Sequence, residues 1–103
     1  MTKIYYEATN NEIMISAIGH TETRVCAAAS VLMDTLAIRL HEVAKDTQCE
    51  AHDGRLWLRA KGVNVRPAFD TIMCGLNQLA AQYPEDISVV EGCPIFANGI
   101  MKK

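Results

Sequence analysis

The sequence lacks several features that would assign it at once to a class of protein. Its 103 residues contain no apolar run of about 18 residues, so we expect no helix that crosses a membrane. Ten Lys and Arg against 12 Asp and Glu give a formal charge of -2, and the missing basic surplus argues against a general nucleic-acid-binding protein. The four cysteines form no Cys-x-x-Cys pair, which argues against a structural zinc site, and we expect no metal or cofactor.

An export signal is also missing, because residues 1–12 are polar and strand-like. We therefore expect a cytoplasmic protein in a reducing compartment, with free thiols at Cys26, Cys49, Cys74 and Cys93. The length is that of one domain, and a composition of 50% hydrophobic and 21% charged residues is typical of a globular fold. We expect the domain to cover residues 1–91 and a loosely attached tail to follow over residues 92–103.

Apolar alternation and short apolar runs predict the strands. They lie over residues 3–8, 13–18, 47–52, 55–61 and 87–90. The Asp53-Gly54 pair between two of them is a strong signal for a two-residue hairpin turn. Within the third strand, Cys49 and Ala51 are predicted to face inward.

Apolar residues spaced three and four apart predict two long amphipathic helices. The first stripe comprises Val25, Ala29, Leu32, Leu36, Leu40 and Val43, and the second comprises Phe69, Ile72, Met73, Leu76, Leu79, Ala80 and Tyr83. Thr21 and Thr23 are candidate N-caps of the first helix, and Pro67 suits the first position of the second. Cys74 lies beside the second stripe, and we expect it in the core.

The resulting order is β-β-α-β-β-α-β, in which hairpins alternate with helices. Hairpins favour antiparallel pairing, and each helix has one apolar stripe to bury. We therefore predict an α+β fold, a two-layer sandwich whose mostly antiparallel sheet carries both helices on one face.

The outer face of the predicted sheet carries a row of cations around one aromatic residue, namely Arg55, Trp57, Arg59 and Lys61. An aromatic ring among cations can stack and pair, so the row is a candidate platform for nucleic acid or peptide. A solvated or dimer-facing surface is the more economical interpretation, with Trp57 as an interface anchor. The net charge of -2 counts against an RNA-associated domain.

The segment over residues 19–30 brings together the groups that thiol chemistry needs. Cys26 falls in the first turn of the first predicted helix, where the positive end of the helix dipole and unpaired N–H groups favour a thiolate. Arg24 adds positive charge, and Gly19 permits a sharp turn. His20 ends the preceding strand, so its imidazole can face the helix start and serve as base. First-turn N–H groups can stabilise an oxyanion.

Spacing alone does not assign these residues to catalysis. A cysteine at the start of an apolar helix is more often a small buried hydrophobe, and a histidine at a strand end is more often a surface residue. His41 on the polar helix face and His52 beside the turn are expected in solvent. Cys93 precedes Pro94 in the predicted tail and has no base fixed near it.

A resemblance shifts this balance. Residues 19–20 (Gly-His) and 25–30 (Val-Cys-Ala-Ala-Ala-Ser) resemble the signature of the ribosomal-processing cysteine protease family, Prp. Its members show Gly-His-Ala, a flexible loop, and then Asp-x-Val-Cys-Ala-Ala-x-Ser. The family order β-β-α-β-β-α matches the elements predicted here over residues 3–83.

The resemblance implies a function and a site. Prp proteases are small cytoplasmic thiol proteases, usually homodimers, that remove an N-terminal extension from a ribosomal protein, and phage relatives cut capsid-related proteins. The resemblance makes Cys26 the nucleophile and His20 the general base. Ser30 matches the family's serine, which would orient a dyad member or bond back to the helix.

The sequence departs from the family pattern in three places. The two dyad positions are six residues apart instead of about a dozen, Thr21 replaces the alanine of Gly-His-Ala, and Arg24 stands near the family acid, which is lost or moved to Glu22. The shortened loop favours a rival hypothesis, a catalytically impaired dimeric module that binds a partner protein.

Overall fold

The computed structural model describes residues 1–20, 23–52 and 54–92. Several predictions concern residues outside these ranges: Thr21 as a helix cap, Glu22 as the moved acid, Asp53 in the hairpin turn, and Cys93 with the rest of the tail.

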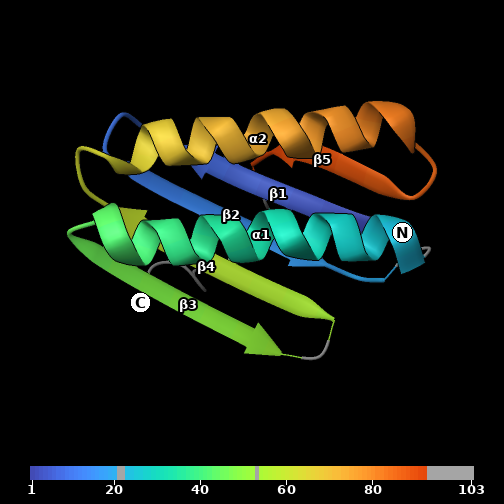
Figure 1. Cartoon of the computed structure of the whole chain (residues 1–103), viewed down its shortest axis with the longest axis horizontal. Helices are drawn as coiled ribbons and strands as arrows, with labels where there is room; N and C mark the ends of the chain where they lie inside the picture. Colours follow the sequence, from blue (N-terminus) through green and yellow to red (C-terminus); the bar gives the residue numbers. More distant parts are fainter. Residues whose placement is uncertain (21–22, 53, 93–103) are drawn as a thin grey trace.

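The described elements follow the predicted order, β-β-α-β-β-α-β (Figure 1). They are β1 (Thr2–Ala8), β2 (Glu12–Ile18), α1 (Thr23–Val43), β3 (Asp46–His52), β4 (Arg55–Lys61), α2 (Val65–Gln82) and β5 (Ile87–Glu91). The second helix begins at Val65, two residues before the predicted start. Pro67 still lies in its first turn, where the missing N–H leaves no helical bond unmade.

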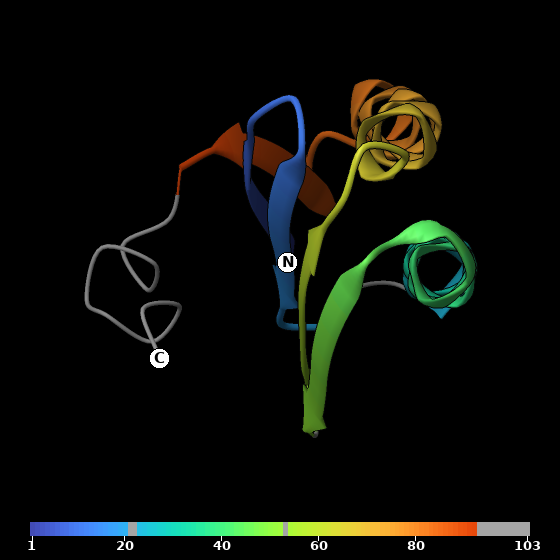
Figure 2. The ribbon, with the colours of Figure 1, turned by 90° about the vertical axis from the view of Figure 1, so that its left-hand side faces the viewer.

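The strands form one sheet in the order β3-β4-β2-β1-β5. Its pairs are antiparallel except β1 with β5, which are parallel. Figure 2 shows α1 and α2 side by side on the same face of this sheet. The predicted α+β fold, with a mostly antiparallel sheet and both helices on one side, is therefore confirmed.

The core lies between the helices and the sheet. Its fully buried side chains come from alternating strand positions and from the two helical stripes, and the largest are Phe69, Ile4, Ile13, Ile15, Met33, Leu36, Leu40, Leu58, Leu76 and Ile87. Met33 belongs to this core although the predicted stripe omitted it. Tyr83 was placed in the second stripe and is 40% exposed, because the helix has ended by that residue.

Two cysteines that the sequence placed inside are exposed, so both predictions are wrong in this respect. Cys74 follows the buried Met73, and one residue along a helix turns the side chain by about 100°. Cys49 pairs with Leu58 and so shares the inner face of the sheet. It is exposed because β3 is the edge strand, and its neighbour Ala51 is exposed for the same reason.

The outer face of the sheet follows the predicted alternation on β4. Arg55 and Lys61 are exposed, and Trp57 is half-buried. Arg59 is partly buried and pairs across strands with Glu12 at 2.8 Å. Neither described helix has the length and apolar character that crossing a bilayer requires.

Candidate active site

The end of β2 places His20 beside the beginning of α1. The chain turns at Gly19, whose φ of +97° is one that side chains rarely allow. A Cβ on Gly19 would also lie 2.5 Å from the carbonyl oxygen of Met1, so the neighbouring strand leaves no room for one. Gly19 therefore makes the turn that carries the chain out of the sheet towards His20.

The helix α1 places Cys26 at its N-terminal end. Cys26 is the fourth residue of the helix, so it lies in the first turn as predicted. Val25 beside it is buried in the core, which holds this turn against the sheet. Cys26 itself is half-buried, so its sulfur is supported by packing while remaining within reach of a substrate.

His20 and Cys26 line the same cavity, which has a volume of about 280 Å³. The start of β1, the end of β2, the β3–β4 hairpin and the first half of α1 form its wall. The lining residues are Thr2, Ala17, Gly19, His20, Cys26, Ala29, Ser30, Met33, Asp34, Ala51, His52, Gly54, Arg55 and Leu56. The cavity thus joins a thiol, an imidazole and the N-terminal turn of a long helix. This combination can carry out nucleophilic attack on a carbonyl group.

Within the described residues, no hydrogen bond joins the Cys26 thiol to the His20 imidazole. His20 is exposed at the cavity mouth. Catalytic hydrogen bonds are often long in a free enzyme and shorten when substrate binds. The shared cavity is therefore the geometric relation that the structure establishes between the two side chains.

Of the three predicted supporting residues, two line the cavity and one does not. Gly19 and Ser30 line the cavity with Cys26, and Ser30 lies one helical turn beyond the thiol. In the described part of the chain, the Ser30 hydroxyl forms no hydrogen bond. Arg24 is exposed on α1 and is not among the residues that line the cavity.

The structure adds residues that sequence reasoning did not assign to the site. Asp34 of α1 lines the cavity, and so do His52 and Gly54 on either side of the β3–β4 turn. The signal that could have found His52 and Gly54 is the sheet order. The pairing of β2 with β4 sets the β3–β4 turn beside the end of β2, where His20 follows.

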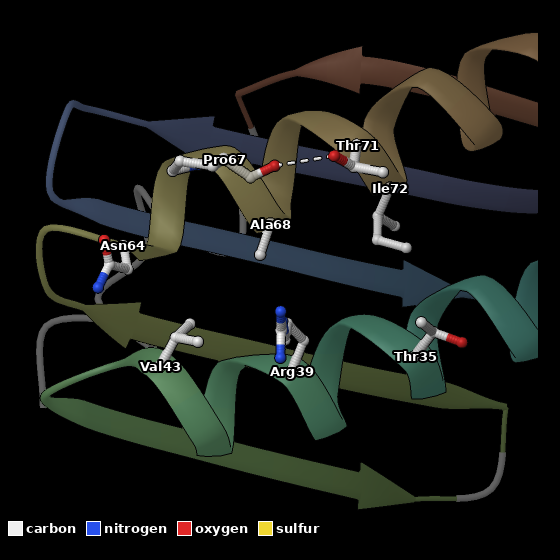
Figure 3. A pocket seen from close by; sticks show the side chains of 8 residues that line it. All are labelled: Thr35, Arg39, Val43, Asn64, Pro67, Ala68, Thr71 and Ile72. Atoms are coloured by element: carbon white, nitrogen blue, oxygen red, sulfur yellow. Dashed lines mark hydrogen bonds between the residues drawn. The ribbon is translucent and has the colours of Figure 1, made fainter.

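Two larger cavities lie elsewhere. One of about 480 Å³ runs between α1 and α2, and Figure 3 shows Arg39 pointing into it. The other, about 630 Å³, lies near Lys45 and Lys61, at the far end of the sheet from His20. Neither is lined by a described cysteine or histidine, so of these three cavities the smaller one alone unites a described thiol with a described imidazole.

Cys49 is in a different electrostatic setting from a catalytic thiol. Partial burial raises the pKa of its thiol above the ordinary value, and the carboxylates of Asp34 and Glu50 raise it further. The raised pKa disfavours the thiolate that nucleophilic attack requires. The described residues also contain no group of three His, Cys, Asp or Glu side chains that could hold a metal ion.

The chain matches known proteins in family and in fold. Residues 1–88 match the family described as cysteine protease Prp. The S. aureus ribosomal processing protease Prp, solved with a covalently linked product peptide, is similar at 17% identity and a TM-score of 0.75, over 89% of this chain and 100% of that one. The structure solved with a substrate peptide gives 16% identity and a TM-score of 0.74, over 89% and 100%.

SMU.848 from Streptococcus mutans is similar at 20% identity and a TM-score of 0.66, over 88% of this chain and 93% of that one. A comparison with curated proteins finds no match. At these identities the likeness to solved structures shows a shared fold. The family match spans most of the chain, and it shows that the chain belongs to the cysteine protease Prp family.

Proposed function

We propose that this protease uses Cys26 as nucleophile and His20 as general base to remove an N-terminal extension from a ribosomal protein. One observation carries the site assignment, namely that the two side chains line one cavity at the start of α1. The substrate class is taken from the fold relative, which is described as a ribosomal processing protease and was solved with a peptide.

The first half of the reaction forms the acyl-enzyme. His20 accepts the thiol proton, and the thiolate of Cys26 attacks the scissile carbonyl carbon to form a C–S bond. Backbone N–H groups in the first turn of α1 donate to the oxyanion, helped by the positive end of the helix dipole. His20 then gives its proton to the leaving amine as the C–N bond breaks.

The second half releases the acyl group. A water molecule takes the place of the departed amine, and His20 accepts its proton as the water oxygen attacks the thioester carbonyl. The C–S bond breaks, the thiolate recovers a proton from His20, and the new carboxyl end leaves. Over the cycle, Cys26 and His20 return to their starting protonation states and one water molecule is consumed. The reaction as written uses no cofactor.

We also propose that the protein acts as a homodimer in the cytoplasm, as the family resemblance implies. A phage capsid-related protein is the alternative substrate. The shorter separation between His20 and Cys26 favours a different function, a dimeric module that binds such a peptide without cutting it. Light scattering during gel filtration measures the oligomeric state directly.

Cleavage is tested with peptides that span the processing junctions of a ribosomal precursor and of a capsid precursor. Mass spectrometry identifies the products. The wild-type protein and Cys74→Ala should cut, because Cys74 is exposed on α2 outside the cavity. Cys26→Ala should bind the peptide and leave it intact. Cutting by Cys26→Ala at the wild-type rate would refute the nucleophile, and binding without cutting by the wild type would establish the non-catalytic module.

A further inference from the structure

The imidazole of His20 packs directly against Gly54, which precedes β4. A Cβ on Gly54 would lie 2.9 Å from Nε2 of His20, 3.4 Å from Cδ2 and 3.6 Å from Cε1. The first distance is shorter than real Cβ contacts show, so the ring occupies the space that a side chain at residue 54 would need. The conformation of Gly54 also favours glycine, because its φ is +71°.

The backbone of this turn also holds the residue before His20. The Gly19 N–H donates a hydrogen bond to the Gly54 carbonyl at 2.8 Å. Gly54 therefore contacts residues 19–20 twice, once through the backbone of Gly19 and once through the ring of His20. Residues 19–20 and residue 54 are far apart in sequence, and the pairing of β2 with β4 brings them together.

No polar contact among the described residues orients the His20 ring. His20 is exposed, and within these residues its imidazole forms no hydrogen bond or ion pair. Many catalytic histidines are oriented by a carboxylate bonded to the second ring nitrogen. Here the packing surface at Gly54 is the contact that the structure shows in that role.

We propose that Gly54 is a positioning residue, whose missing side chain forms the surface that holds the His20 imidazole at the cavity mouth. Gly54 thereby belongs to the active site, although it carries no reacting group. This inference rests on the proposed role of His20 as the base. A Cβ at residue 54 would displace the ring, and a displacement on the order of 1 Å can lower a rate by about 10²-fold.

Gly62 provides a matched control at the other end of β4. Its φ is +144°, and an added Cβ would lie 2.9 Å from the backbone nitrogen of Lys45. Gly62→Ala therefore introduces strain away from the cavity, and more of it than Gly54→Ala, because the opposing atom at Gly62 is backbone and not the end of a side chain. A second variant, Gly54→Asn, separates the two effects at the site, because asparagine tolerates positive φ but still carries a Cβ.

The experiment records the imidazole NMR signals of His20, assigned with His20→Ala, together with thermal stability and cleavage kinetics. We expect Gly54→Ala and Gly54→Asn to shift the His20 signals. Both should lower kcat by about 10²-fold at nearly unchanged KM and move the pH profile of kcat/KM. Gly62→Ala should lose stability while keeping the His20 signals and kcat of the wild type.

Unchanged His20 signals in Gly54→Ala would overturn the inference, as would equal losses of kcat in the Gly54 and Gly62 variants. Full recovery in Gly54→Asn would also overturn it, because backbone strain would then be the cause. If the wild-type protein cuts no peptide, the proposed function fails. The NMR signals still decide whether Gly54 holds the ring.

Discussion

Leu32 of α1 packs directly against Gly75 of α2. A Cβ on Gly75 would lie 3.0 Å from Cδ2 of Leu32 and 3.3 Å from its Cδ1. Glycine at this position lets the two helices approach closely while both cover the same face of the sheet (Figure 2). The contact accounts for part of the burial of Leu32, which is half-buried and packs against the core.

The first prediction concerns this helix contact. Gly75→Leu should lower the free energy of unfolding by about 1–3 kcal/mol, because the larger side chain overpacks the space that Leu32 fills. The double variant Leu32→Ala with Gly75→Leu should recover part of the loss, since volume moves from one helix to the other. Urea unfolding of the four proteins in this cycle measures the coupling. Strictly additive effects would contradict the contact.

The second prediction concerns the core. Phe69 is 2% exposed and its ring lies 5.8 Å from that of Tyr6. Phe69→Ala should destabilise the protein by about 3–5 kcal/mol, because it removes buried area and leaves a cavity. Ile38→Ala is the control, since Ile38 is 65% exposed, and it should change stability by no more than about 0.5 kcal/mol. Comparable losses in the two variants would be inconsistent with this core.

The third prediction concerns the base. His20→Ala should lower kcat/KM by roughly 10²–10⁴-fold, the usual loss when a general acid–base group is removed. His41 provides the control, because it lies outside the cavity and its Nδ1 is 2.8 Å from the carbonyl oxygen of Ala37. His41→Ala should cleave the same peptide at the wild-type rate. If His20→Ala also cleaves at that rate, another group is the base.

The fourth prediction concerns the pH dependence of Cys49. Burial, Asp34 and Glu50 all raise the pKa of its thiol, so the folded protein holds the neutral form to higher pH than the unfolded chain. Iodoacetamide labelling of Cys49 should therefore rise at higher pH in the folded protein than in urea, and Asp34→Asn should shift the rise downward. Peptide mapping separates Cys49 from the other thiols. A midpoint at or below that of the unfolded chain would be the contrary result.

The raised pKa of the Cys49 thiol also makes the stability of the protein depend on pH. A thiol whose pKa is higher in the folded state favours folding while it is protonated in both states. That contribution is present below the pKa of the unfolded thiol and declines as the pH rises through the pKa of the folded one. Cys49→Ser should remove this decline, and thermal unfolding across alkaline pH measures it.

The fifth prediction concerns the C-terminal end. We propose that the domain covers residues 1–91, because the described buried side chains lie between Thr2 and Ile87. Gly92 is kept because its N–H donates to the carbonyl oxygen of Tyr6 at 2.6 Å. A chain ending at Gly92 should fold with a Tm within about 4 °C of the full chain. A much larger drop would assign residues 93–103 to the fold.

Periodicity predicted the elements well because it depends on local geometry alone. A strand repeats every two residues and a helix about every 3.6, so alternation around Leu58 and the stripe through Leu36 and Leu40 identify both kinds of element. The positions of Cys49 and Cys74 could not be predicted in this way. The exposure of Cys49 depends on which strand lies at the edge of the sheet, and that of Cys74 depends on how wide the buried face of α2 is.

The amino-acid order by itself determined the succession of strands and helices, the place of Cys26 in the first turn of α1, and the family signature around it. Only the tertiary structure decided that β2 lies beside β4, and hence that Gly54 meets His20 and that His52 lines the cavity with His20. The reason is physical. Local periodicity acts over a few residues, whereas these neighbours are set by strand pairing between segments more than 30 positions apart.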